Sequence, residues 1–103
     1  MSEEKLLQVY VMKSLRSIGC LVYKFSSPSQ RGVPDLLSIT PTGETMYFEI
    51  KNPTGSGRLT RLQGHHIDLI RKQHAYAEII ISREQIDRVV AGIETHVRSM
   101  RSH

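Results

Sequence analysis

Two spacings of apolar residues alternate along the chain and predict helices and strands in turn. Leucine, valine and isoleucine at every third or fourth position predict a first helix over residues 3–19. Ser2 is its expected N-cap and Gly19 its expected C′ residue. On this helix Glu4 falls within the apolar stripe, whereas Glu3 lies to one side. Glu4 is therefore either a core-facing carboxylate that needs a partner or a solvated group favoured by the helix dipole.

Short runs of β-branched and aromatic residues predict strands over residues 21–25, 36–39 and 45–51. A Pro-Thr-Gly-Glu turn at residues 41–44 joins the last two strands, which predicts an antiparallel hairpin. In an antiparallel pair the start of one strand lies beside the end of the other. We therefore expect Asp35, which begins one strand, to lie next to Glu49, near the end of its partner.

The second half of the chain predicts a helix, a strand and a final helix. Thr60 and Gln63 form a capping box that starts a helix ending near residue 73. The apolar positions of this helix are Leu62, Ile67, Leu69 and Ile70. Residues 77–81 predict a short strand buried in the sheet.

The last helix begins after Ser82, which forms a possible capping box with Gln85, and runs to about Met100. Its apolar stripe suits either the seam of a helix pair or a helix that lies on the sheet of its own chain. The predicted order αβββαβα is an α/β fold. At 103 residues, the chain is expected to form one domain, residues 1–103.

Composition narrows the classes of function. The formal net charge of +4 favours a polyanionic partner. Cys20 is the only cysteine, which excludes an internal disulfide and a thiolate zinc cluster. The N-terminus has no signal-peptide pattern, and no apolar stretch reaches the roughly 18 residues of a membrane span. A cytoplasmic protein without membrane association is expected.

Two carboxylates and a lysine at strand ends form the residue set that metal-assisted phosphodiester cleavage requires. Asp35 and Glu49 are expected ligands of a hard divalent cation, with the main-chain carbonyl of Ile50 between them. Lys51 shares a strand face with Glu49 and is expected to orient or deprotonate the attacking water, or to offset transition-state charge. Glu4 is a candidate further carboxylate. The candidate phosphate contacts are Arg31, Arg58 and Arg61.

Each signal also has a structural explanation. Neighbouring charges on a strand are commonly a solvated ion pair, and Pro-Asp before a strand is ordinary turn chemistry. Gln63 is explained by the capping box alone. His65 and His66 are adjacent on a helix and do not face one another, so a zinc site is not favoured. No phosphate-binding loop or nucleophile elbow is present.

The combined motifs resemble the VRR-NUC (virus-type replication-repair nuclease) domain of the PD-(D/E)xK nuclease superfamily. The matching motifs are Glu4…Gln8, Gly32-x-Pro34-Asp35, Glu49-Ile50-Lys51 and Leu59-Thr60-x-Leu62-Gln63. The resemblance covers about residues 3–81. It implies a restriction-endonuclease-like core with a mixed central sheet flanked by helices.

The same resemblance implies that Asp35, Glu49 and the Ile50 carbonyl bind Mg²⁺ or Mn²⁺. It also implies that Lys51 is catalytic and that Glu4 and Gln63 complete the site. Stand-alone members of the family, often phage-encoded, resemble homodimeric Holliday junction resolvases.

We therefore expect a metal-dependent, structure-selective DNA endonuclease that acts on branched DNA as a homodimer. The final helix is the first candidate interface and the hairpin edge the second. Two alternatives remain open: a sequence-specific duplex endonuclease, and a non-enzymatic basic DNA-binding module.

Overall fold

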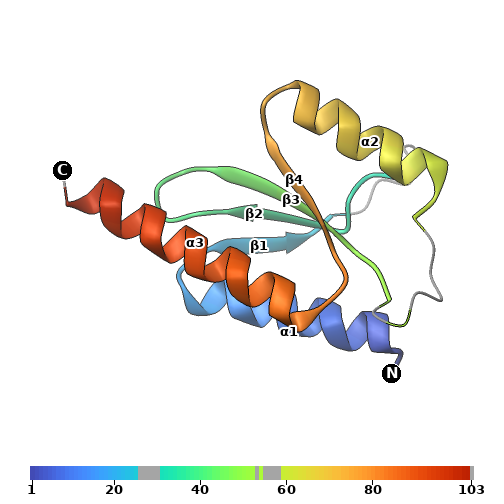
Figure 1. The fold of residues 1–103 in the computed structure, drawn as a ribbon, viewed down its shortest axis with the longest axis horizontal. Helices are drawn as coiled ribbons and strands as arrows, with labels where there is room; N and C mark the ends of the chain where they lie inside the picture. The colour runs from blue at the N-terminus through green and yellow to red at the C-terminus, as the bar shows by residue number, and fades with distance from the viewer. Residues whose placement is uncertain (26–30, 53, 55–58, 103) are drawn as a thin grey trace.

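The computed structural model describes residues 1–25, 31–52, 54 and 59–102. Its elements follow the predicted order αβββαβα (Figure 1). They are α1 (Glu3–Ser17), β1 (Leu21–Lys24), β2 (Leu36–Ile39), β3 (Thr45–Ile50), α2 (Arg61–Lys72), β4 (Tyr76–Ile80) and α3 (Arg83–Arg101). The predicted α/β class is confirmed.

The strands form one mixed sheet in the order β1-β2-β3-β4. β2 pairs antiparallel with both β1 and β3, so the predicted hairpin is confirmed. β3 and β4 run parallel, joined by a crossover through α2. β4 was expected to be buried in the sheet, but it is an edge strand, and Tyr76 is 40% exposed. A short apolar run looks alike in either position because helices can cover an edge strand.

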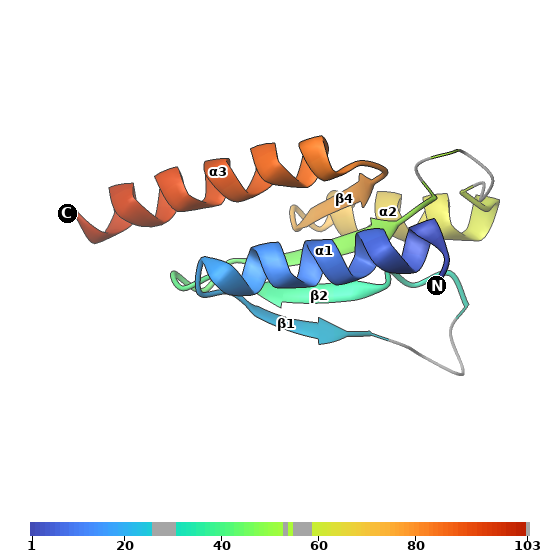
Figure 2. The ribbon, with the colours of Figure 1, turned by 90° about the horizontal axis from the view of Figure 1, so that it is seen from below.

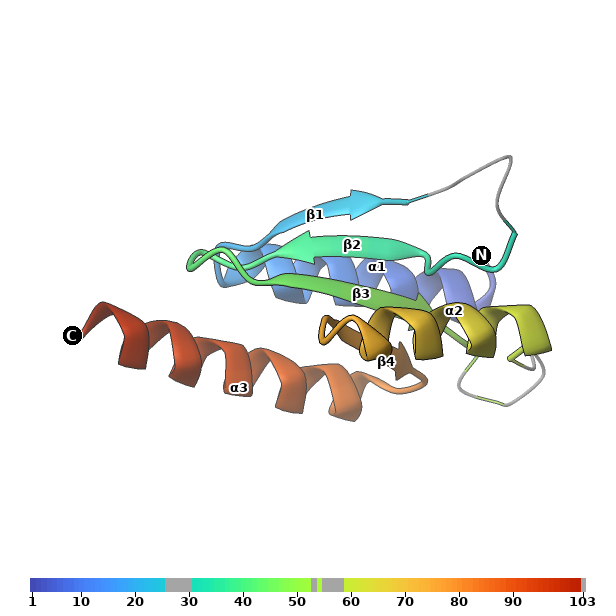
Figure 3. The ribbon, with the colours of Figure 1, turned by 90° about the horizontal axis from the view of Figure 1, so that it is seen from above.

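The helices lie on both sides of the sheet. α1 and α3 share one side and contact each other, whereas α2 lies over β4 on the other (Figures 2 and 3). Ser2 caps α1 as predicted, with its Oγ accepting a hydrogen bond from the Lys5 N–H at 3.1 Å. Gly19 follows the helix with a φ of 91°, a conformation that favours glycine.

The core lies between the α1–α3 layer and the sheet. It contains buried residues of α1, the strands and α3, among them Val11, Leu15, Leu36, Phe48, Ile80 and Ile86. On α2, by contrast, only Ile67 of the predicted apolar positions is buried, and Leu62 and Leu69 are 43% and 42% exposed. The reason is that α2 covers only the β4 side of the sheet. No helix of the described residues is long and apolar enough to cross a membrane.

Both surfaces expected to form a dimer interface are engaged within the chain. The stripe of α3 buries Ile86 and Val97, and α3 packs beside α1 of the same chain, while Met100 stays exposed. The hairpin edge was wrong as a candidate, because β1 and β4 flank β2 and β3 on either side. The hairpin has no open edge between them.

Candidate active site

The open end of the β2–β3 hairpin brings the predicted acidic residues together. The main-chain N–H of Ile50 donates to Asp35 Oδ2 at 2.8 Å, which ties the start of β2 to the end of β3. Glu49 lies directly before Ile50, and the nearby charge of Asp35 helps to raise the pKa of Glu49. The adjacency expected from the turn is thus present.

Glu49 is buried, with only 1% of its surface exposed. Its Oε2 atom accepts a hydrogen bond from Gln63 Nε2 at 2.9 Å and lies 3.7 Å from Lys51 Nζ. Its Oε1 atom is buried and has no hydrogen-bond partner among the described residues. A buried polar atom without a partner costs free energy, so a carboxylate held in this way is unlike the solvated pair that the sequence also allowed.

Burial raises the pKa of Glu49 from its ordinary value of 4.5 to about 8. The neighbouring charge of Asp35 adds to this shift, and Glu4 contributes a smaller repulsion. Lys51 opposes the shift through its positive charge. Burial and the charge of Asp35 together outweigh the effect of Lys51, and a cation bound there would favour the ionised form of Glu49.

Gln63 serves the helix and the site at once. The capping box of α2 is complete: Thr60 Oγ1 accepts from the Gln63 N–H at 3.1 Å, and Gln63 Oε1 accepts from the Thr60 N–H at 3.0 Å. Since the amide oxygen is fixed by Thr60, the amide nitrogen points at Glu49. The two explanations that the sequence left open for Gln63 are compatible.

Gly32 connects the turn before β2 to the start of α2. Its φ is 81°, and a Cβ atom built there would lie 2.7 Å from Leu62 Cγ and 3.0 Å from the Leu62 carbonyl carbon. Only glycine fits this approach without displacement. Because Gln63 follows Leu62, this contact also sets where Gln63 meets Glu49. Arg31 and Arg61, each adjacent in sequence to one side of the contact, are exposed.

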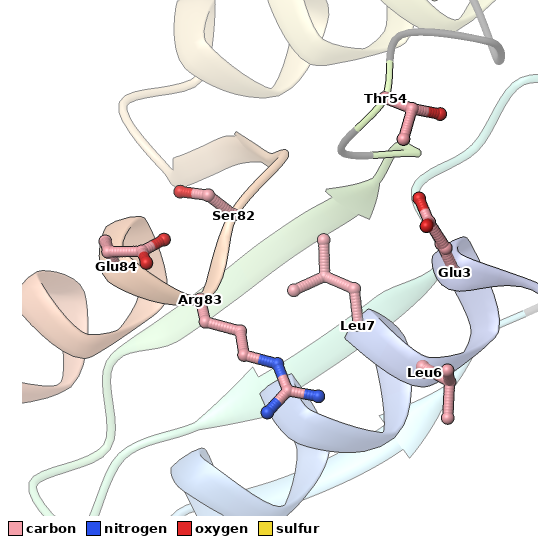
Figure 4. Close-up of a pocket in the computed structure, with 7 residues that line it drawn as sticks. All are labelled: Glu3, Leu6, Leu7, Thr54, Ser82, Arg83 and Glu84. Atoms are coloured by element: carbon pink, nitrogen blue, oxygen red, sulfur yellow. The ribbon is translucent and has the colours of Figure 1, made fainter.

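Glu4 and Asp35 line a common cleft of about 380 Å³ between α1 and the end of β1. Glu4 is half-buried, which lies between the core-facing and the solvated positions that the sequence left open. Glu3 instead lines a separate cleft of about 430 Å³ between the starts of α1 and α3 (Figure 4). There its carboxylate points toward Thr54, while Arg83 extends over α1 (Figure 4). The two neighbouring glutamates thus belong to different surfaces.

The cleft with Glu4 and Asp35 is lined by four further described residues, of which the sequence motifs had included only Gln8. Lys5, Gln8, Lys24 and Phe25 line it. Lys24 pairs with Leu36, directly after Asp35, so the β1–β2 register brings its charge to the site. That register was the missing signal, since strand pairing across β1 cannot be read from a local motif. Arg58 lies outside the described residues.

The residues at the hairpin end offer oxygen donors to a hard cation such as Mg²⁺. No three His, Cys, Asp or Glu side chains among the described residues are clustered closely enough to hold one ion. The donor set that could hold such an ion is the Asp35 and Glu49 carboxylates with the Ile50 carbonyl. The partnerless Glu49 Oε1 fits this role.

No family model matches the sequence. The chain is 40% identical over 50 residues to "Putative nuclease p44" of Acyrthosiphon pisum secondary endosymbiont phage 1, across 48% of this chain and 54% of that protein. It thus spans about half the length of this curated relative. A solved structure described as "VRR_NUC domain" matches with a TM-score of 0.79 and 26% identity, over 88% of this chain and 97% of that one. The resemblance predicted from the motifs, and the restriction-endonuclease-like core, are confirmed.

Proposed function

We propose that this chain, a VRR-NUC domain of the PD-(D/E)xK superfamily, is a DNA endonuclease that hydrolyses phosphodiester bonds with Mg²⁺ or Mn²⁺. We assign this activity to one domain, residues 1–103. The observation that carries the proposal is the buried Glu49 carboxylate, which has one partnerless oxygen among the described residues and a repelling neighbour in Asp35. A purely structural role, as in a non-enzymatic DNA-binding module, gives no reason for the burial of the partnerless oxygen, whose cost the contacts of Oε2 with Gln63 and Lys51 do not offset.

The residues of the site divide the work. Asp35, Glu49 and the Ile50 carbonyl would hold the cation, and a cation bound there would supply positive charge beside the phosphate and lower the pKa of the attacking water. The Ile50 N–H fixes Asp35, and the Gln63 amide fixes Glu49, so both carboxylates are held before the ion binds.

The remaining polar residues surround the phosphate. Lys51, next to Glu49, orients the water or offsets charge that develops on the phosphate. Glu4 lines the same cleft as Asp35 and serves as a further carboxylate, directly or through a water. Arg31, Arg58 and Arg61 contact the DNA backbone.

The substrate we propose is branched DNA, in particular a four-way junction, resolved by a homodimer. Each chain carries one set of site residues, and a two-fold dimer presents two sets in matched orientation to a two-fold symmetric junction. The phage origin of the matched relative supports action in the cytoplasm of a bacterial host.

The catalytic proposal is tested with Lys51→Ala and a labelled immobile four-way junction. We expect cleavage in Mg²⁺ to fall at least about a hundredfold, because a charge at the reacting phosphate is lost. Binding of the junction in Ca²⁺, measured by gel shift, should stay within about threefold, since most affinity comes from backbone contacts elsewhere. Full activity of the variant, or wild-type cleavage that persists in EDTA, contradicts the proposal.

The substrate class is tested with the wild-type protein on a panel of junctions, flaps and random-sequence linear duplexes. Preferential incision of the junctions supports the proposal, whereas site-specific cutting of linear duplex supports a sequence-specific endonuclease. No incision of any substrate in Mg²⁺ or Mn²⁺ favours a DNA-binding module. Sedimentation at micromolar concentration, with and without junction DNA, tests the dimer, and a monomer in both cases excludes it.

A further inference from the structure

We propose that Pro34 is a positioning residue that keeps the Ile50 carbonyl free to bind a metal ion. The inference rests on the proposed function, because it assigns a purpose to a carbonyl of that site. Pro34 is buried and directly precedes Asp35. It does not touch the reacting atoms in this proposal, and it acts only through the end of the hairpin.

The strand register places Pro34 opposite Ile50. Leu36 pairs with Phe48 in the antiparallel β2–β3 ladder. Each step toward the open end moves one residue back along β2 and one forward along β3, so two steps give Pro34 and Ile50. The alternation of the ladder makes this a pair that should exchange two hydrogen bonds, one in each direction.

Two bonds show that Ile50 faces β2. The Ile50 N–H donates to Asp35 Oδ2, on the β2 side, at 2.8 Å. The next residue, Lys51, faces the other way, and its N–H donates to the Ile80 carbonyl of β4 at 2.9 Å. In an antiparallel ladder the carbonyl of a residue points to the same neighbour as its N–H, so the Ile50 carbonyl also points toward β2.

Proline has no N–H to donate. The ladder bond that would otherwise reach the Ile50 carbonyl is therefore missing, and outside the strand ladders no backbone hydrogen bond to this carbonyl comes from a described residue. The carbonyl stays at the open end beside Asp35 and Glu49. Any other residue at position 34 would extend the ladder by one pair and draw the carbonyl toward β2.

A second effect follows at the Ile50 N–H. In an extended ladder this group would donate to the carbonyl of residue 34, in competition with Asp35 Oδ2, which accepts it in the structure. Because the ladder ends at Pro34, the Ile50 carbonyl stays without a ladder hydrogen bond, and the Ile50 N–H stays available to orient Asp35. Ordinary turn chemistry explains a Pro-Asp dipeptide before a strand. At this position, proline also keeps the Ile50 carbonyl free beside Asp35.

The test compares Pro34→Ala with Pro41→Ala, which makes the same chemical change in the turn at the far end of the hairpin. Affinity for Mn²⁺ alone is measured by calorimetry at pH 9, and amide exchange at the substituted residue by NMR in metal-free protein. We expect Mn²⁺ affinity to fall about three- to tenfold in Pro34→Ala, because a competing hydrogen bond of ordinary strength forms. The new amide at position 34 should be protected from exchange, and Pro41→Ala should bind Mn²⁺ like the wild type.

Pro34→Val repeats the test if the alanine variant folds poorly, since valine restores the N–H and retains more buried volume. An exposed, fast-exchanging amide at residue 34 overturns the inference, and so does a protected amide with unchanged affinity. Failure of the wild-type protein to bind Mn²⁺ at all refutes the proposed function instead. The two failures are therefore distinguishable.

Discussion

Each end of the β2–β3 hairpin has one glutamate: Glu44 lies in the turn before β3, and Glu49 lies near the end of β3. The surroundings of the two carboxylates have opposite effects on their ionisation. At the turn, Glu44 is half-exposed, and its Oε1 accepts hydrogen bonds from the hydroxyls of Thr40 and Thr42. His96 of α3 approaches the same oxygen to 3.5 Å. The Thr40 hydroxyl, followed by Thr42, lowers the pKa of Glu44.

At the open end, Glu49 is buried and repelled by Asp35, and one of its oxygens has no partner among the described residues. Burial raises its pKa to about 8. The same side chain on the same hairpin is therefore stabilised as an anion at one end and destabilised as an anion at the other. A fold that needed only a well-formed hairpin would use the arrangement of Glu44 at both ends, so the difference marks the open end as the functional one.

The largest expected effect is a difference in cleavage rate between variants at the two ends of the hairpin. Glu49→Gln should reduce junction cleavage about a thousandfold or more, because an amide is a poor ligand for Mg²⁺ and supplies no charge. Glu44→Gln makes the same change at the turn and should leave the rate within about twofold. Single-turnover cleavage measures both rates.

An equal loss in the two variants would mean that the distinction between the ends is wrong. Thermal melting of both proteins serves as the control, since a variant that does not fold gives no information about the site. Glu49→Gln is expected to fold at least as well as the wild type above pH 8, because it removes a buried charge.

The proximity of Asp35 and Glu49 could be predicted because it depends only on the order of the strands and the turn between them. A turn at residues 41–44 between two apolar runs forces the start of β2 to meet the end of β3, whatever surrounds them. Helical spacing likewise distinguished Glu4 from Glu3. In both cases the periodicity of one or two elements was enough.

The burial of Glu49 was not predictable in the same way. It depends on where α2 crosses the sheet, whereas neighbouring charges on a strand are more often a solvated Glu–Lys pair. Lys24 reaches the cleft through the β1–β2 register, and β4 lies at the sheet edge because of the strand order. These features are set by long-range packing, which local motifs do not encode.

The second prediction compares the stability cost of replacing two glycines, one near each end of the hairpin. Gly43 in the turn has a φ of 91°, and apart from its two chain neighbours no described residue has an atom within 4 Å of the position that a Cβ would take there, whereas Gly32 has a φ of 81° and meets Leu62. Gly43→Ala should cost about 1 to 2 kcal/mol, the strain of the left-handed backbone. Gly32→Ala should cost about 2 to 5 kcal/mol, because a steric clash is added to that strain.

Urea denaturation measures both free energies of unfolding. Gly32→Ala should also slow cleavage, because a shift of Leu62 moves Gln63 away from Glu49. Gly43→Ala, which leaves that contact unchanged, is the control. Equal destabilisation of the two variants would show that the contact between Gly32 and α2 is not tight.

The last prediction concerns the pH dependence of stability, and its sign differs between the two ends. Glu49 has a pKa of about 8 in the folded protein against an ordinary 4.5, so the native state binds more protons than the unfolded state between these values. The stability of the metal-free protein should therefore fall as pH rises from about 4.5 to about 8, and then level off. Glu44 has a lowered pKa, so its contribution is present above its unfolded pKa and is lost as pH falls through its folded pKa.

Melting temperatures from pH 3 to pH 9 separate the two groups, because their windows lie on opposite sides of the unfolded value. Glu49→Gln should flatten the curve between pH 4.5 and 8, whereas Glu44→Gln should change it only at the acid end. Mn²⁺ requires ionised Glu49. Below pH 8, the affinity of the protein for Mn²⁺ should therefore increase by up to about tenfold for each unit by which the pH is raised. A metal-free stability that rises through this window would show that Glu49 is ionised without a cation, and the contrast between the two ends of the hairpin would then lose its electrostatic basis.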